Sequence, residues 1–145
     1  MTPTYRQDNA HFTYNNANPK NCKTAGDCVI RALALALNKD WDDVFIELSH
    51  MAFNAKRAIG DPKLYLLYLN SHGWTKYPQP RKTDNKKVQL KDFCKQCDPN
   101  RSYVVSLAGH LTCVKGGKIQ DTWDCGDSTV GNYWSVGASG SGYKY

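Results

Sequence analysis

One apolar run most constrains how this chain can fold. In the stretch Val29–Leu37 every residue except Arg31 is apolar, and alanine and leucine, both strong helix formers, dominate it. A helix that is apolar on all sides belongs in a protein core. Asp27 suits the N-cap position, and Asn38 can adopt the left-handed conformation that ends a helix. The sequence therefore predicts a buried helix between these two residues.

This predicted helix carries two ionisable residues, Cys28 and Arg31, whose roles depend on the neighbouring charges. Cys28 falls in the first turn, where unpaired N–H groups and the helix dipole stabilise an anion. There the pKa of a thiol can fall from about 8.5 to ~3.5–7.5, which gives a reactive thiolate near neutral pH; a small buried cysteine without chemistry is the alternative. Arg31 needs an acidic partner in the core, for which we expect Asp124 or the Asp42–Asp43 pair.

Length and composition indicate one globular domain over residues 1–145. No apolar run reaches the ~20 residues of a membrane span, and the polar stretch 1–23 has no signal-peptide core. We therefore expect a cytoplasmic protein without a membrane partner. The 6 cysteines are then expected to be free thiols, metal ligands or catalytic groups rather than a disulfide framework.

The residue pattern changes along the chain from helical to extended. Helices are predicted over 41–53, 62–70 and 90–97, and strands over 11–14, 103–107, 111–114, 119–123 and 133–136. We expect an extended lead-in over 1–20, an exposed basic loop over 76–91 and a flexible tail over 137–145. Helices followed by strands indicate an α+β fold, with the core helix packed on a C-terminal antiparallel sheet.

The net charge of +6 is concentrated in the expected basic loop, residues 76–91. Such a loop can attract an acidic partner such as nucleic acid. It has few interleaved aromatic residues, however, and those provide the stacking surface for bases. The pattern therefore favours a solvated loop and argues against nucleic acid as the partner.

Two arrangements compete for the cysteines and the only late histidine. The first is a zinc site, because Cys94-x-x-Cys97 is followed by His110-x-x-Cys113. If residues 110–113 form a strand, however, positions three apart point to opposite faces of the sheet, so these two residues could not reach one metal. We therefore expect neither a metal nor another cofactor.

The second arrangement joins Cys28, His110 and Asp121. Nucleophilic acyl transfer needs a thiolate, an imidazole that carries the proton and a third group that orients the imidazole. A tight turn at Lys115–Lys118 predicts that His110 and Asp121 lie on paired strands, where their side chains can meet on one face. This triad is our candidate catalytic site.

These motifs resemble papain-like cysteine peptidases, and more closely the small single-domain ones found in phages and bacteria. The segments that carry the resemblance are Asn18-Pro19-Lys20, Gly26-Asp27-Cys28-Val29-Ile30-Arg31-Ala32, Gly109-His110, and Gly117-Lys118-Ile119 with Asp121-Thr122-Trp123-Asp124. The resemblance implies that Trp123 covers the contact between the histidine and its orienting residue. Papain-type enzymes place an oxyanion-binding glutamine six residues before the cysteine, but Cys22 stands there. Asn21 is the nearest amide, and we expect it to hold the oxyanion together with the Cys28 N–H group.

The resemblance implies a cysteine peptidase or isopeptidase that hydrolyses an amide bond in a peptide or protein substrate. It also implies a host cytoplasm if the protein is phage-encoded. Acyl transfer onto an amine, as in transglutaminases, uses the same groups and remains an alternative. A non-catalytic interaction protein, zinc-binding or nucleic-acid-binding, is the other.

Overall fold

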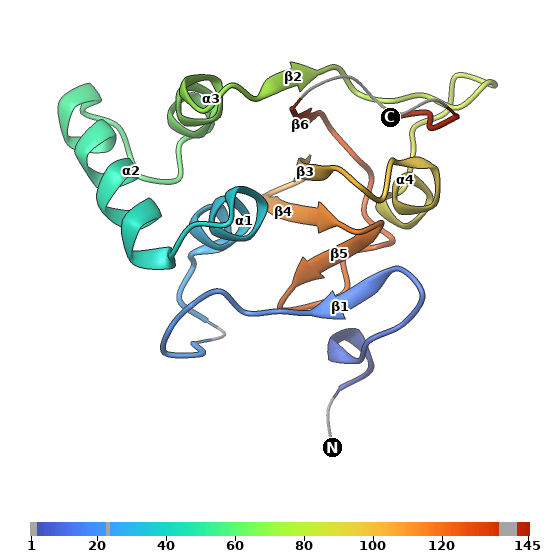
Figure 1. Ribbon diagram of the computed structural model, residues 1–145, viewed down its shortest axis with the longest axis horizontal. Helices are drawn as coiled ribbons and strands as arrows, with labels where there is room; N and C mark the ends of the chain where they lie inside the picture. The colour runs from blue at the N-terminus through green and yellow to red at the C-terminus, as the bar shows by residue number, and fades with distance from the viewer. Residues whose placement is uncertain (1–2, 23, 137–141) are drawn as a thin grey trace.

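Helices dominate the first part of the chain and strands the last (Figure 1). The computed structural model describes residues 3–22, 24–136 and 142–145. Over these residues the fold is α+β, with four α-helices and a six-stranded mixed sheet. The elements are η1 (Thr4–Arg6), β1 (Phe12–Tyr14), α1 (Cys28–Leu37), α2 (Trp41–Ala55), α3 (Pro62–Ser71), β2 (Thr75–Tyr77), α4 (Leu90–Gln96), β3 (Ser102–Leu107), β4 (His110–Lys115), β5 (Lys118–Asp121) and β6 (Tyr133–Ser135).

The sheet has the strand order β1-β5-β4-β3-β6-β2. Four of its neighbouring pairs are antiparallel, but β1 runs parallel to β5, with Tyr14 opposite Asp121. The predicted antiparallel pairing holds for the C-terminal strands, while the N-terminal strand β1 adds a parallel edge. A long stretch of chain separates β1 from β5, so no hairpin turn fixes the direction in which β1 joins the sheet.

Two apolar cores lie on opposite faces of the sheet. Alternate residues of β3 divide between them, because successive strand side chains point to opposite faces. Val104 packs with α1, α2 and α3 in what we call the α1 core. Tyr103 and Val105 pack with α4 in the α4 core. In Figure 1 α1 and α4 accordingly lie on either side of the strands.

The core helix α1 has the predicted limits. It begins at Cys28 and ends at Leu37, and Asn38 follows in the left-handed conformation with φ 54°. Six of its residues are buried, which are Ile30, Arg31, Ala32, Leu33, Ala34 and Ala36. The apolar run therefore predicted both the helix and its place in the core.

The other helices begin where the sequence predicts, with local differences. Asp61 accepts a hydrogen bond from the Lys63 N–H group at the start of α3 (2.9 Å), and Pro62 occupies the first position. Leu64 of α3 is buried, whereas Leu67, one turn further along, is 54% exposed. The helix packs along a narrower stripe than its leucines suggest.

The segments expected to be irregular are partly ordered. Within 76–91, Val88 is buried in the α4 core and an isolated bridge joins Arg81 to Lys87. Of the tail 137–145, residues 137–141 lie outside the described residues. Tyr145 is buried and stacks on Phe93 with ring centroids 4.6 Å apart, so the expectation of a loose tail does not hold for this last residue.

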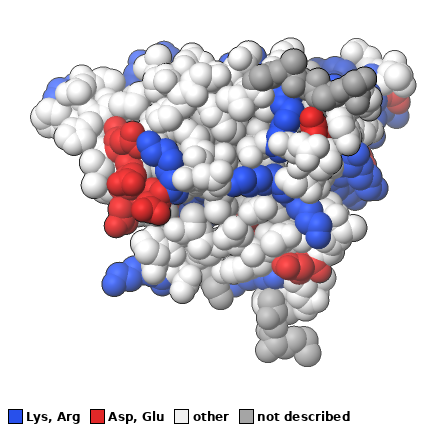
Figure 2. Space-filling view, in the orientation of Figure 1, with Lys and Arg blue, Asp and Glu red and all other residues white. Residues whose placement is uncertain are grey.

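Charged side chains are unevenly distributed over the surface. Figure 2 shows acidic residues gathered over the beginning of α2, where Asp42 and Asp43 occupy the first turn. Lysines and arginines are spread across the rest of this face in separate groups. In the part of the chain that the structure describes, no helix combines the length and apolar character that crossing a bilayer requires.

Candidate active site

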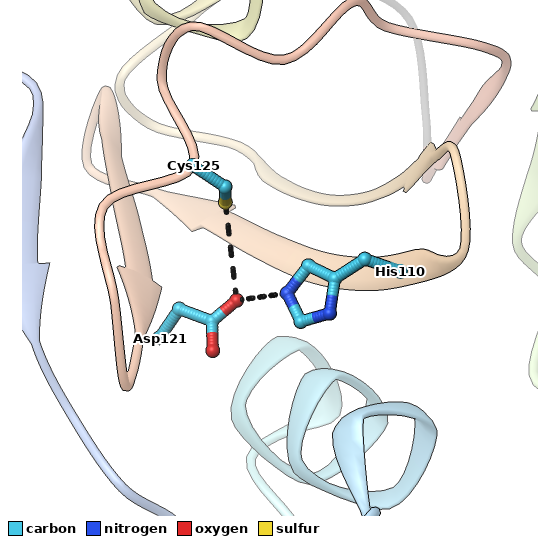
Figure 3. A group of neighbouring side chains, drawn as sticks. All are labelled: His110, Asp121 and Cys125. Carbon is cyan, nitrogen blue, oxygen red and sulfur yellow. Dashed lines mark hydrogen bonds and ion pairs between the residues drawn. The ribbon is translucent and has the colours of Figure 1, made fainter.

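Three elements meet at one end of the sheet and supply the predicted triad. Cys28 is the first residue of α1, His110 the first of β4 and Asp121 the last of β5. Because β4 and β5 are antiparallel neighbours, the start of one lies beside the end of the other. Gly109 precedes His110 with φ 66°, a left-handed conformation that few other residues adopt without strain. In Figure 3 His110 and Asp121 point toward each other across the two strands.

A short hydrogen bond joins His110 to Asp121. The Nε2–H group of His110 donates to Asp121 Oδ2 at 2.6 Å, and the two side chains are 12% and 4% exposed. Thr112 Oγ1 donates to the same oxygen at 2.7 Å, and the Thr122 N–H group donates to Oδ1 at 2.7 Å. Burial works against ionisation of Asp121, but these bonds and the histidine hold the pKa of the carboxyl below its usual range. The carboxylate therefore fixes the orientation of the ring and leaves Nδ1 for Cys28.

The ionisation of Cys28 and His110 is coupled. The hydrogen bond with His110 lowers the pKa of the half-buried Cys28 thiol, against the effect of its burial, and the Leu111 backbone lowers it further. Burial would lower the pKa of His110, but hydrogen bonds with Asp121, Cys125 and Cys28 raise it to about 11. The pair therefore favours thiolate and imidazolium, the form in which a cysteine attacks a carbonyl.

A buried chain of charges extends from this pair into α1. Arg31 forms an ion pair with Asp27, and its Nη2 lies 3.5 Å from Asp121 Oδ1. Asp27 Oδ2 also accepts from Asn18 Nδ2 (3.0 Å) and Trp41 Nε1 (2.8 Å). The charges of Asp27, Arg31, Asp121, His110 and Cys28 thus alternate in sign. This arrangement offsets the cost of burying each of them.

The expected partners of Arg31 were wrong. Asp124 instead bonds His11, whose Nε2 lies 2.8 Å from Oδ2. The true partner Asp27 stands four residues before Arg31, and that spacing on a helix was the available signal. Asp27 sits at the N-cap position but makes no side-chain cap bond, because its oxygens are engaged elsewhere.

The two predicted supporting residues differ in where they lie. The Trp123 ring is 5.1 Å from the His110 ring, centroid to centroid, and tilted by 48°. It therefore lies beside the imidazole, and its role in covering the contact between His110 and Asp121 stays a prediction. Asn21 is exposed in the loop before α1, with φ 53°, and is not among the residues that line the pocket around Cys28. The structure does not bring this amide to the nucleophile, so its oxyanion role stays a prediction.

Cys125 was not predicted as a site residue. Its buried Sγ lies 4.0 Å from Asp121 Oδ2, the same oxygen that the His110 ring contacts (Figure 3). Burial raises the pKa of its thiol, so this cysteine is a neutral neighbour of the triad rather than a second nucleophile. Its position follows from the turn after β5, for which the sequence holds no distinctive signal.

Among the described residues one group has the composition of a metal site, namely His110, Asp121 and Cys125, whose ligand atoms lie within 4.8 Å of one another. Tetrahedral zinc with ligands at roughly 2.0–2.2 Å would need its nitrogen and oxygen ligands about 3.3 Å apart. The 2.6 Å separation of His110 Nε2 and Asp121 Oδ2 is a hydrogen bond instead. This cluster fits a proton-holding network better than a metal.

The four residues of the zinc alternative are not brought together. Cys94 and Cys97 are buried in the α4 core, whereas Cys113 packs in the α1 core. His110 and Cys113 lie on opposite faces of β4, as the strand alternation predicted. Each of these three cysteines has a raised pKa because it is buried.

A pocket opens beside the thiol. It has a volume of about 310 Å³ and is lined largely by apolar side chains. Cys28 and His110 are at its wall, together with Tyr65, Leu107 and Leu111. A substrate carbonyl can therefore approach the sulfur from an open side.

The comparisons with known proteins give no further guide to this site. The chain matches no protein-family model, no curated protein and no solved structure.

Proposed function

We propose that this protein is a papain-like cysteine hydrolase that cleaves an amide bond in a peptide or isopeptide substrate. One observation carries the proposal: a thiol at a helix N-terminus lies at the wall of the same pocket as an imidazole, which a buried carboxylate orients at 2.6 Å. A buried cysteine without chemistry would need neither a histidine partner nor an open pocket. The reduced thiol that such an enzyme needs agrees with the cytoplasmic setting expected from the sequence.

The reaction begins with the Cys28 thiolate attacking the carbonyl carbon of the substrate. The oxyanion that forms can accept hydrogen bonds from N–H groups in the first turn of α1, which the Asp27 side chain does not cap. The His110 imidazolium donates its proton to the leaving amine as the carbon–nitrogen bond breaks. A thioester between Cys28 and the acyl group remains.

The second half releases the acyl group. Neutral His110 takes a proton from water, whose oxygen attacks the thioester carbon. The carbon–sulfur bond breaks, the carboxylic acid leaves, and the thiolate–imidazolium pair is restored. Throughout, Asp121 holds the ring orientation, and Trp123 covers the ring, which limits the access of other water molecules.

Alkylation with iodoacetamide near pH 6, followed by peptide mapping, tests the proposal. We expect Cys28 to react at least about tenfold faster than Cys22, because the lowered pKa of Cys28 leaves more of its thiol in the thiolate form at this pH. Cys22 is the internal control, since it is half-buried like Cys28. Equal rates at the two cysteines would contradict the proposal. If Cys28 reacts faster, unmodified protein is then incubated with a peptide library, with and without an added amine. Carboxylic acid products indicate hydrolysis, and amide products formed with the added amine indicate acyl transfer.

A further inference from the structure

A second hollow continues from the pocket beside Cys28. It has a volume of about 200 Å³ and shares Pro62 and Tyr65 with the first pocket. Tyr65 is only 8% exposed and packs edge-on against Trp134, with ring centroids 5.5 Å apart. Because two residues line both hollows, they form one groove that passes over Tyr65 toward β2 and β6.

The far hollow has a largely apolar lining with two lysines at its wall. Lys63 and Lys76 lie at its wall, and both side chains are exposed. Lys76 stands opposite Trp134 in the β2–β6 pair, with its Nζ 5.9 Å from the ring centre. Among the described residues, neither lysine has a carboxylate within ion-pair distance, and Asp61, close to Lys63 in the chain, pairs with Arg57 at 3.0 Å.

Two of the residues that line this hollow also carry buried donors without acceptors. Trp134 is 2% exposed, and its Nε1–H group has no hydrogen-bond partner among the described residues. The same holds for Asn132 Nδ2. Both nitrogens lie beneath the surface, so the groups that a ligand can reach directly are the two exposed amines of Lys63 and Lys76. Two amines at one hollow complement the charge of a carboxylate.

We propose that this groove binds an acidic peptide, with an apolar side chain in the pocket beside Cys28 and a carboxylate in the hollow of Lys63, Lys76, Asn132 and Trp134. The near pocket suits the apolar side chain because Val29, Leu107 and Leu111 line it. The binding of this peptide does not depend on the proposed hydrolase function. Only the statement that the peptide is the substrate rests on that function. The proposal narrows the substrate class to peptides that carry both groups.

Binding is measured on the Cys28→Ala variant by NMR titration, with acetylated and amidated peptides of alanine and leucine that carry one glutamate. Matched peptides carry glutamine, or glutamine with a free C-terminal carboxylate. We expect the glutamate peptide to bind about threefold or more tightly than its glutamine match and to shift the Trp134 indole signal. Tighter binding of the peptide with the free C-terminus would assign the hollow to a terminal carboxylate instead of a side chain.

Variants identify the residues responsible. The Lys63→Gln/Lys76→Gln double variant should lose the preference for glutamate. Lys95→Gln, an exposed lysine on α4, is the matched control and should retain it. Equal binding of both peptides, an unmoved indole signal, or an equal loss in Lys95→Gln would overturn the inference.

Cleavage by the wild-type protein is measured separately. Cleavage without a preference for glutamate would refute the acidic groove and leave the hydrolase standing. A preference for glutamate in binding without any cleavage would refute the hydrolase and leave the groove as a peptide-binding site.

Discussion

The first turn of α1 and the core beneath α4 place the same side chain in opposite environments. Cys28 is half-buried, and its hydrogen bond with His110 lowers the pKa of the thiol. Cys94 and Cys97 lie in the α4 core, where burial raises the pKa of each thiol, that of Cys97 to about 11. The difference lies in the neighbours: one thiol meets a charged partner, while the others meet apolar side chains.

This contrast shows what a reactive cysteine requires in a chain with several thiols. Burial alone protects a thiol and keeps it neutral. A helix N-terminus and an oriented imidazole reverse that effect at a single position. The surrounding charges, Asp27 and Arg31, belong to the same arrangement because they connect α1 to Asp121.

Removing the imidazole of His110 should have the largest effect, because it removes the main cause of the difference in thiol pKa between Cys28 and the buried cysteines. In His110→Ala we expect alkylation of Cys28 at pH 6 and any amide cleavage to fall by about 10²–10⁴-fold, because the proton carrier and the stabilising charge are both lost. His50→Ala, at an exposed position on α2, is the control. Unchanged alkylation of Cys28 in His110→Ala would mean that the helix terminus alone activates the thiol.

Breaking the buried chain of charges should destabilise the reactive end of the sheet. Arg31→Met leaves Asp27 and Asp121 buried without their shared cation, and we expect a loss of about 3–5 kcal/mol in the free energy of unfolding. Urea denaturation measures it. Arg57→Met removes a more exposed ion pair, with Asp61, and should cost much less stability, because solvent screens that pair. Similar losses in the two variants would show that the buried network adds no special stability.

Serine substitutions should separate the two kinds of cysteine. Cys94→Ser puts a hydroxyl into the apolar α4 core, and we expect a loss of about 1–3 kcal/mol in stability with amide cleavage retained by the folded protein. Cys28→Ser should change stability by about 0.5 kcal/mol or less but abolish thiol-dependent cleavage. Denaturation and activity measured on the same samples test both statements. A reversed pattern would place the chemistry beneath α4.

The smallest effect concerns the pH dependence of His110. Burial lowers its pKa, but the hydrogen bonds with Asp121, Cys125 and Cys28, of which that with Asp121 is the largest, together raise it to about 11. The ring should therefore stay protonated well above the usual range of histidine and lose its proton only as the pH approaches that value. In Asp121→Asn the carboxylate charge is gone, so the NMR titration of His110 should move to lower pH. An unshifted titration would mean that Cys28 and Cys125, rather than Asp121, raise the pKa of His110.

Much of this arrangement follows from local signals in the sequence. The apolar run predicted α1 and its two ends, and Gly116–Gly117 predicted the turn that brings His110 and Asp121 together. Long-range contacts carry no such local signal. The parallel pairing of β1 and the place of Cys125 beside Asp121 depend on how distant segments pack. The papain-like resemblance and the role of Asn21 remain predictions.

The order of the strands along the chain determines when Cys28, His110 and Asp121 can come together during synthesis. As the chain is synthesised from its N-terminus, Cys28 emerges long before β4 and β5, which carry its partners. Strand β1, with its backbone bonds to β5 and the Asn15 N–H group bonded to the Asp121 carbonyl (2.9 Å), cannot pair until β5 exists. The contacts among Cys28, His110 and Asp121 therefore form only when the sheet closes, after nearly the whole chain has been synthesised.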